Sequence, residues 1–170
     1  LLPGTTQPSQ KAFETRLWDT LRQLDRQRPV FVEAESKRVG NITVPEPLIA
    51  AMRQAPCVHL NLPMAQRVQL LMRDYAHFVQ DVAPFCERLE ALVSLCGRQR
   101  VTQWQQAARS GAVGEAVQSL LAEHYDPRYH ESIERNFAQS ARGPHMQVLG
   151  IEPTAMHRAA HEVVEWANSL

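Results

Sequence analysis

One short segment, residues 29–40, most strongly constrains what this chain can fold into. It reads Pro-Val-Phe-Val-Glu-Ala-Glu-Ser-Lys-Arg-Val-Gly, so an apolar run passes directly into a cluster of charged side chains. β-Branched and aromatic residues between chain breakers are typical of a buried strand, and we expect one over 29–35. In open α/β sheets, ligands bind beyond the carboxyl ends of the strands. The charge cluster is therefore either a ligand-contacting loop or an ordinary solvated turn after a core strand.

Helices and strands alternate at both ends of the chain. Apolar residues at helical spacing predict amphipathic helices, and short apolar runs predict two further strands. The expected helices cover 10–25, a short stretch ending near 55, the residues after Pro63, and 155–168; the expected strands cover 57–62 and 146–150. Alternation of this kind indicates a parallel sheet.

The middle of the chain has a different character. Residues 84–139 carry no strand signal and show several runs at helical spacing, with Asp126-Pro127 resembling a cap followed by a first-turn proline. We therefore expect an α/β core formed by 1–82 and 140–170, with a helical insertion or lid over 83–139.

Composition limits the class of partner. The 170 residues carry 18 basic and 18 acidic side chains, so any contact with RNA or phosphate has to come from a local patch. The three cysteines, Cys57, Cys86 and Cys96, match neither a zinc motif nor a disulfide framework, which predicts reduced thiols and no metal site. No apolar run approaches the roughly 20 residues of a membrane span, and we expect a cytoplasmic protein without membrane contact.

The first candidate site lies at the end of the segment 29–40. Glu33 and Glu35 are two residues apart and would share one face of a continuing strand. Two carboxylates there can hold Mg²⁺ or act as an acid–base pair. Alternatively, one pairs with Arg38 and the other is solvated.

Two helix starts are candidate anion sites. Ser9, Gln10 and Lys11 place a hydroxyl, an amide and an ammonium group at a helix N-terminus, although ordinary capping explains Ser9 equally well. Arg67 lies close to the start of the helix after Pro63, where its charge opposes the helix dipole. A bound anion would compensate; the alternative is a solvent-facing arginine near Asp74.

The third candidate is the stretch 124–129, which reads His-Tyr-Asp-Pro-Arg-Tyr. Its rings, together with an arginine, can stack a nucleobase. His124 and Asp126 can form an oriented acid–base pair. The alternative is a helix break anchored by Tyr125 and Tyr129.

Four blocks together carry a family resemblance. They are Gln7-Pro8-Ser9-Gln10-Lys11-x-Phe13-Glu14, Arg28 to Gly40, Pro63-x-x-x-Arg67-x-x-x-Leu71-x-x-x-Tyr75, and His124-Tyr125-Asp126-Pro127-x-Tyr129. In order and spacing they resemble the tRNA 2-selenouridine synthase family over nearly the whole chain. The Glu-Ala-Glu-Ser block with the upstream Ser-Gln-Lys is the most specific of these matches.

The resemblance implies a two-part enzyme. Such proteins join a rhodanese-like domain with a catalytic cysteine to a P-loop domain, and convert the wobble 2-thiouridine of tRNA first to a geranylated form with geranyl diphosphate and then to 2-selenouridine with selenophosphate. The expected fold here is an incomplete P-loop-like parallel sheet flanked by helices. By this resemblance Ser36, Arg38, Lys11 and Arg67 become ligand contacts, and Tyr125 and Tyr129 become contacts for tRNA or the prenyl chain.

The chain also departs from the family pattern. It contains no G-x-x-x-x-G-K-[ST] loop and no rhodanese cysteine motif, so no catalytic residue is assigned. We expect a C-terminal portion that binds diphosphate or tRNA and is inactive alone, with no cofactor of its own and Mg²⁺ left open. The alternatives are a non-catalytic tRNA-docking module and a nucleotide kinase-like remnant.

Overall fold

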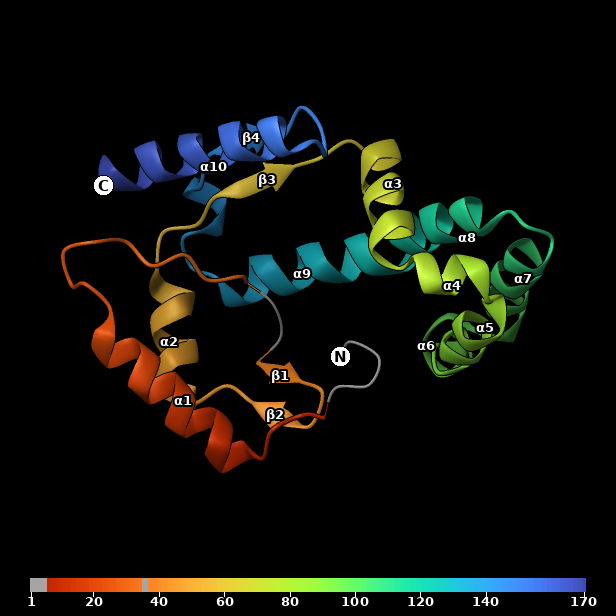
Figure 1. The fold of residues 1–170 in the computed structure, drawn as a ribbon, viewed down its shortest axis with the longest axis horizontal. Coiled ribbons are helices and arrows are strands. Elements are labelled where there is room, and N and C mark those ends of the chain that lie inside the picture. Colours follow the sequence, from red (N-terminus) through yellow and green to blue (C-terminus); the bar gives the residue numbers. More distant parts are fainter. Residues whose placement is uncertain (1–5, 35–36) are drawn as a thin grey trace. The chain divides into compact units, whose positions relative to one another are not determined.

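The chain forms two compact units, each described here by itself. The computed structural model describes residues 6–34 and 37–170. The first unit comprises the chain up to Val58 together with 133–144 and 161–170. The second comprises 59–132 and 145–160. Figure 1 labels the elements.

The first unit is built around a helix and a small hairpin. Its elements are α1 (Gln10–Gln23), β1 (Arg38–Val39), β2 (Ile42–Thr43), α2 (Glu46–Gln54) and the 3₁₀ turn η2 (Ser140–Arg142). The strands β1 and β2 pair antiparallel, and β2 lies against α1 (Figure 1). Gly40 makes the tight turn between them with φ of +60°, a conformation that glycine adopts without strain.

Two glutamine side chains attach this hairpin to the start of α1. The Gln7 amide donates to the Val39 carbonyl and accepts from the Asn41 N–H at 2.9 Å. The Gln10 amide donates to the Thr43 carbonyl at 2.8 Å and accepts from the Thr43 N–H at 2.9 Å. Each side-chain amide thereby makes the pair of hydrogen bonds that a neighbouring strand would make with the hairpin backbone.

The second unit is mostly helical. It contains β3 (His59–Asn61), α3 (Met64–Asp74), α4 (Ala76–Gln80), α5 (Val82–Glu90), α6 (Val93–Cys96), α7 (Arg98–Arg109), α8 (Val113–Leu120), the π-helical turn η1 (Leu121–Tyr125) and β4 (His145–Gln147). Helices α9 (Asp126–Asn136) and α10 (Pro153–Asn168) belong partly to each unit. Within 6–34 and 37–170, no helix has the length and apolar character needed to cross a membrane.

The hydrophobic core of the second unit lies among α5, α7 and α8. Leu89, Val101, Trp104 and Ala116 are all almost fully buried there. The Trp104 Nε1–H donates to Ser119 Oγ at 2.8 Å, so the one polar group of this large ring is satisfied. The absence of strands over 84–139, predicted from the sequence, is confirmed.

A parallel pair of strands gives the chain its α/β character. Strands β3 and β4 pair in parallel with His59 opposite His145, Leu60 opposite Met146 and Asn61 opposite Gln147. The two strands predicted at 57–62 and 146–150 are therefore confirmed, although each is shorter than expected. The predicted helices after residue 9, after Pro63 and near the C-terminus are confirmed as α1, α3 and α10.

The strand predicted at 29–35 is wrong for the residues the structure describes. Residues 29–34 run without regular secondary structure, and Val30, Phe31 and Val32 are each more than half exposed. A buried parallel strand needs hydrogen-bonded neighbours and cover on both faces, and none of the described residues pairs with 29–34. An apolar, β-branched segment forms a strand only where a neighbouring strand can pair with it.

Asp126 does not cap a new helix, contrary to the expectation from Asp126-Pro127. Its backbone is helical, with φ −61° and ψ −46°, and α8 continues into α9 through the π turn η1. A proline inside an α-helix lacks the N–H and crowds the carbonyl four residues earlier. A wider π turn directly before Pro127 relieves that crowding. The same turn changes the directions in which the side chains of 121–126 project.

Candidate functional site where helix α3 meets the start of helix α9

Two motifs far apart in the sequence meet in the second unit. Arg67 on α3 donates from Nη1 to Asp126 Oδ2 at 2.8 Å and from Nη2 to Asp126 Oδ1 at 2.6 Å. The side chains are 28% and 21% exposed. This end-on, bidentate arrangement is the strong form of an arginine–carboxylate pair. The expected partner Asp74 is instead 3.4 Å from the neighbouring Arg73.

The pair shifts the ionisation of both partners. The hydrogen bonds from Arg67, with its positive charge, lower the pKa of the Asp126 carboxyl, although burial opposes them. The hydrogen bond to Asp126 raises the pKa of Arg67. Both groups are therefore firmly charged at neutral pH.

Arg67 keeps hydrogen-bonding capacity beyond this pair. A guanidinium has five N–H donors, and the end-on contact with Asp126 uses two of them. Within the described part of the chain, Arg67 makes no other side-chain hydrogen bond. Asp126 thus holds the planar group in a fixed orientation while three donors stay available to a ligand.

Two tyrosines flank Asp126 and stack on one another, which gives a small aromatic surface. The rings of Tyr125 and Tyr129 stack with centroids 5.7 Å apart and planes 12° from parallel. Tyr129 also meets the edge of His130, whose Nδ1 lies 2.7 Å from the Asp126 carbonyl oxygen. Tyr125 is 43% exposed, so part of this surface faces solvent.

His124 pairs with a cysteine rather than with Asp126. Its Nδ1 lies 3.0 Å from Cys96 Sγ, while both carboxylate oxygens of Asp126 are taken by Arg67. The acid–base pair expected between His124 and Asp126 is therefore wrong. Burial, and then the positive charge of Arg128, lower the pKa of His124.

The predicted anion site at the start of α1 is occupied by structural contacts. Ser9 caps the helix by accepting from the Ala12 N–H at 3.3 Å, as ordinary capping requires. Gln10 spends its amide on Thr43 and also donates to Glu14 at 2.7 Å. Lys11 is exposed.

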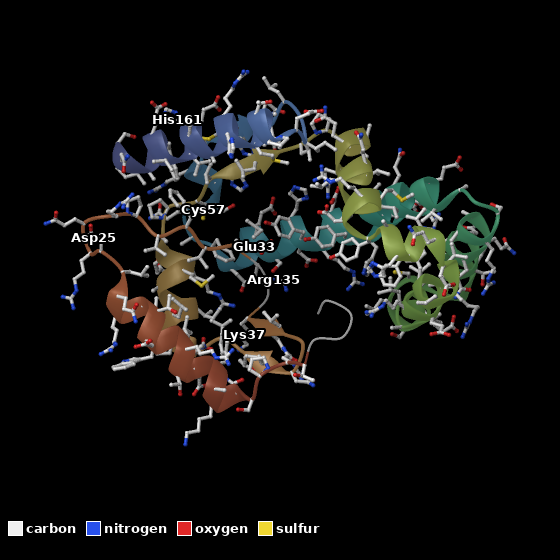
Figure 2. All side chains as sticks on the ribbon, in the orientation of Figure 1. Asp25, Glu33, Lys37, Cys57, Arg135 and His161 are labelled. Carbon is white, nitrogen blue, oxygen red and sulfur yellow. The ribbon has the colours of Figure 1, made fainter. Side chains whose placement is uncertain are left out.

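The charge cluster after 29–34 is only partly described. Glu33, labelled in Figure 2, is exposed on the extended segment and does not end a strand. Glu35 and Ser36 lie outside the described residues. Arg38 begins β1 and donates from Nε to the Gly40 carbonyl at 3.2 Å, and Lys37 lies 3.6 Å from Glu46.

The predicted contacts therefore fall into two groups. Ser9, Gln10, Lys11, Glu33 and Arg38 belong to the first unit. Arg67, His124, Tyr125, Asp126 and Tyr129 belong to the second, where Arg67 and Asp126 bond to one another and Tyr125 stacks on Tyr129. Convergence of Lys11 and Arg38 with Arg67 on one ligand stays a prediction.

Sequence reasoning missed two of the contacts that shape these groups. Nothing in the residues around Cys96 indicates that its thiol faces His124, because the two residues are 28 positions apart and meet only in the folded chain. The spacing of Gln7 and Gln10, three apart at a helix start, offered a signal for the hairpin. Among the described residues, no three His, Cys, Asp or Glu side chains gather as metal ligands would, and no metal centre is assigned.

Comparison with known proteins adds a family to this geometry. The family model of the tRNA 2-selenouridine synthase AAA domain matches residues 3–91. A protein of Pseudomonas fluorescens named tRNA 2-selenouridine synthase is 34% identical over 86% of this chain and 46% of its own length. A protein of the same name from Pseudomonas syringae pv. syringae is 35% identical over 86% of this chain and 48% of its own length.

A third protein of that name, from Aeromonas salmonicida, is 37% identical over 45% of this chain and 21% of its own length. No solved structure is significantly similar. The chain spans about half the length of the first two of these relatives.

Proposed function

The chain belongs to the tRNA 2-selenouridine synthase family, and from this premise we propose that it serves the replacement of sulfur by selenium at the wobble 2-thiouridine of tRNA. The family's AAA domain is of the P-loop type, in keeping with the parallel pair β3–β4 flanked by helices. The reaction proceeds through a geranylated uridine formed from geranyl diphosphate, followed by displacement with selenophosphate. The substrates are tRNA and these two phosphate compounds.

The second unit contributes an anion-binding group to this reaction. Arg67 is oriented by Asp126 and keeps three N–H donors, which suits the oxygens of a diphosphate. Charge that develops on a departing diphosphate is best stabilised by a cation that is already fixed in place. The bidentate contact between Arg67 and Asp126 is the observation that carries this proposal.

The stacked tyrosines contribute a surface for the organic part of a substrate. Tyr125 and Tyr129 lie directly before and shortly after Asp126 and present parallel rings. Aromatic faces of this kind accept a nucleobase by stacking or an isoprenoid chain by apolar contact. The diphosphate would then lie on Arg67 while its geranyl chain or the target uridine lies on the rings.

The catalytic groups are not assigned to these 170 residues. The sequence has no phosphate-binding Gly-Lys loop and no rhodanese cysteine motif, and it matches about half the length of its relatives. We therefore propose that turnover requires a rhodanese-like domain and a phosphate loop as well, and takes place in the cytoplasm. Mg²⁺ would be bound, if at all, through the substrate phosphates.

A tRNA-docking module is the second candidate function. It is favoured by the partly exposed tyrosine pair, which can stack an RNA base without taking part in chemistry. Under this alternative Arg67 would contact a phosphate of the RNA backbone rather than a prenyl diphosphate. The kinase-like alternative would also need a phosphate loop from outside these 170 residues, and ATP binding tests it.

A binding experiment separates these functions. Affinities of geranyl diphosphate, ATP and 2-thiouridine tRNA are measured for the wild-type chain and for Arg67→Gln. The matched control is Arg73→Gln, which breaks an exposed pair on the same helix. Circular dichroism confirms that both variants are folded.

The proposal expects Arg67→Gln to weaken geranyl diphosphate binding about tenfold, the effect of one lost charge-assisted contact, while tRNA binding persists. Weakened tRNA binding with a salt slope reduced by about one, and no change for geranyl diphosphate, would establish the docking module instead. Equal affinities in wild type and Arg67→Gln for all three ligands would refute both.

A further inference from the structure

The contact between Cys96 and His124 has no part in the function proposed above. Sγ of Cys96 lies 3.0 Å from Nδ1 of His124, within the distance of a thiol–imidazole hydrogen bond. We propose that Cys96 is a nucleophilic thiol, with His124 as its base, and that it is a site of thiol–disulfide exchange with small disulfides. This inference does not depend on the proposed function.

Local structure brings the two side chains together from distant positions. Cys96 is the last residue of α6, and Gly97, with φ of +81°, turns the chain directly into α7. His124 lies in the π turn η1. π turns of this kind occur frequently at functional sites.

The other two thiols have different surroundings. Cys86 is buried in the helical core, with its Sγ 3.9 Å from the Gln105 carbonyl. Cys57 is partly exposed and lies 3.6 Å from the Ala55 carbonyl, and burial raises the pKa of its thiol. Among these three, only Cys96 has a side-chain base within hydrogen-bond distance, and it is half-buried rather than enclosed. Cys57 and Cys86 therefore serve as comparisons for Cys96 within the same chain.

The surroundings of His124 keep its ring in the neutral form. Burial, and then the charge of Arg128, lower the pKa of His124, so the ring is neutral at pH 7 and one of its two nitrogens is free of a proton. The same arrangement, an imidazole against a cysteine, activates thiols in many unrelated proteins. The proposal takes Cys96 as donor and Nδ1 of His124 as acceptor, which requires the neutral ring to carry its proton on Nε2.

The exchange step balances without an external oxidant. His124 Nδ1 takes the Cys96 proton, and the thiolate attacks one sulfur of the small disulfide. A new S–S bond forms between Cys96 and that half of the reagent, and the original S–S bond breaks. The other half leaves as a thiolate and recovers a proton from His124 or water, so the product is a mixed disulfide and one free thiol.

The test is a rate for each cysteine. The whole chain is treated at pH 7 with 5,5′-dithiobis(2-nitrobenzoic acid), and mass spectrometry of the modified peptides gives separate rates for Cys57, Cys86 and Cys96. The variants are His124→Gln, which removes the base, and His130→Gln, a matched control. The His130 imidazole lies six residues after His124 and contacts the Asp126 backbone carbonyl. A parallel series in denaturant gives the rate of each thiol without folded structure.

We expect Cys96 to react at least tenfold faster than Cys57 in the folded chain and to lose about tenfold in His124→Gln, the low end of the contribution of a general base. His130→Gln should leave the rate within twofold, and denaturant should remove the advantage of Cys96. A Cys96 rate no higher than that of Cys57, or one that is unchanged or higher in His124→Gln, overturns the inference. If His124→Gln acted only by exposing Cys96 to solvent, the rate would rise. Loss of the base lowers the rate, so the two effects can be told apart.

Discussion

Replacing Asp126 by asparagine tests the contact on which the candidate site depends. Asparagine keeps the shape of the side chain and one acceptor oxygen but removes the charge that faces Arg67. The two hydrogen bonds, of 2.8 and 2.6 Å, connect α3 to the start of α9. The substitution therefore removes the attraction between these helices with little change in packing.

The expected cost follows from exposure and geometry. Two unit charges about 4 Å apart attract by roughly 4 kcal/mol at an effective dielectric constant of about 20, and partial desolvation of both ions offsets part of this. Exposed pairs contribute about 0–1 kcal/mol, and breaking a fully buried pair costs about 3–5 kcal/mol. With side chains 28% and 21% exposed, this pair lies between these limits. We expect Asp126→Asn to lower the free energy of unfolding of the second unit by about 2 kcal/mol.

Trp104 provides a reporter for that unit alone. It is 2% exposed in the core among α5, α7 and α8, whereas Trp18 and Trp166 belong to the first unit. In a Trp18→Phe, Trp166→Phe background, urea denaturation followed by Trp104 emission measures the unfolding of the helical core. Asp126→Asn, Arg67→Gln and the double variant then complete a double-mutant cycle.

The cycle separates attraction between the partners from their separate effects. A coupling of about 1.5 kcal/mol between Arg67 and Asp126 is expected, and the control Arg73→Gln should cost less than about 0.5 kcal/mol because its pair with Asp74 is exposed. A coupling as small as that control would show that the pair does not hold the two helices together. The argument that Asp126 orients Arg67 for a ligand would then lose its basis.

Three further outcomes follow from other contacts. Arg67 lowers the pKa of Asp126 below its unfolded value of about 3.9. The stabilisation by this pair is therefore full above about pH 4–5 and is lost as pH falls through the folded pKa. Below about pH 4, the stability of the Trp104 core should fall less steeply with pH in Asp126→Asn than in wild type. Ser119→Ala leaves the buried indole N–H of Trp104 without its acceptor and should cost about 1–2 kcal/mol in urea denaturation, and an unchanged midpoint would contradict this. Gly40→Ala places a Cβ 2.7 Å from the Gln7 amide at a positive φ, so hydrogen exchange of the hairpin amides should accelerate about tenfold. Gln7→Ala should not restore the protection, because it removes two hydrogen bonds to the hairpin.

Local sequence patterns predicted the helices well and one strand badly, for a physical reason. The apolar stripes of α1, α3 and α10 are periodic within a single element, so they indicate a helix whatever surrounds it. A strand is stabilised by its neighbours, and 30–32 has the composition of a sheet centre without a sheet partner in the described chain. Segments 57–62 and 146–150 do find partners, namely one another, and both form strands.

The candidate site shows the same division between local and tertiary information. Spacing identified Arg67 and the His124–Tyr129 stretch separately, and each had an ordinary interpretation when considered alone. Only the fold shows that Arg67 and Asp126 are partners. It also shows that His124 contacts Cys96 instead of Asp126. His124 and Tyr125 lie in the π turn before Pro127, and Asp126 directly follows it. Both proposals therefore depend on contacts between residues far apart in the chain, Arg67 with Asp126 and Cys96 with His124, which spacing alone does not reveal.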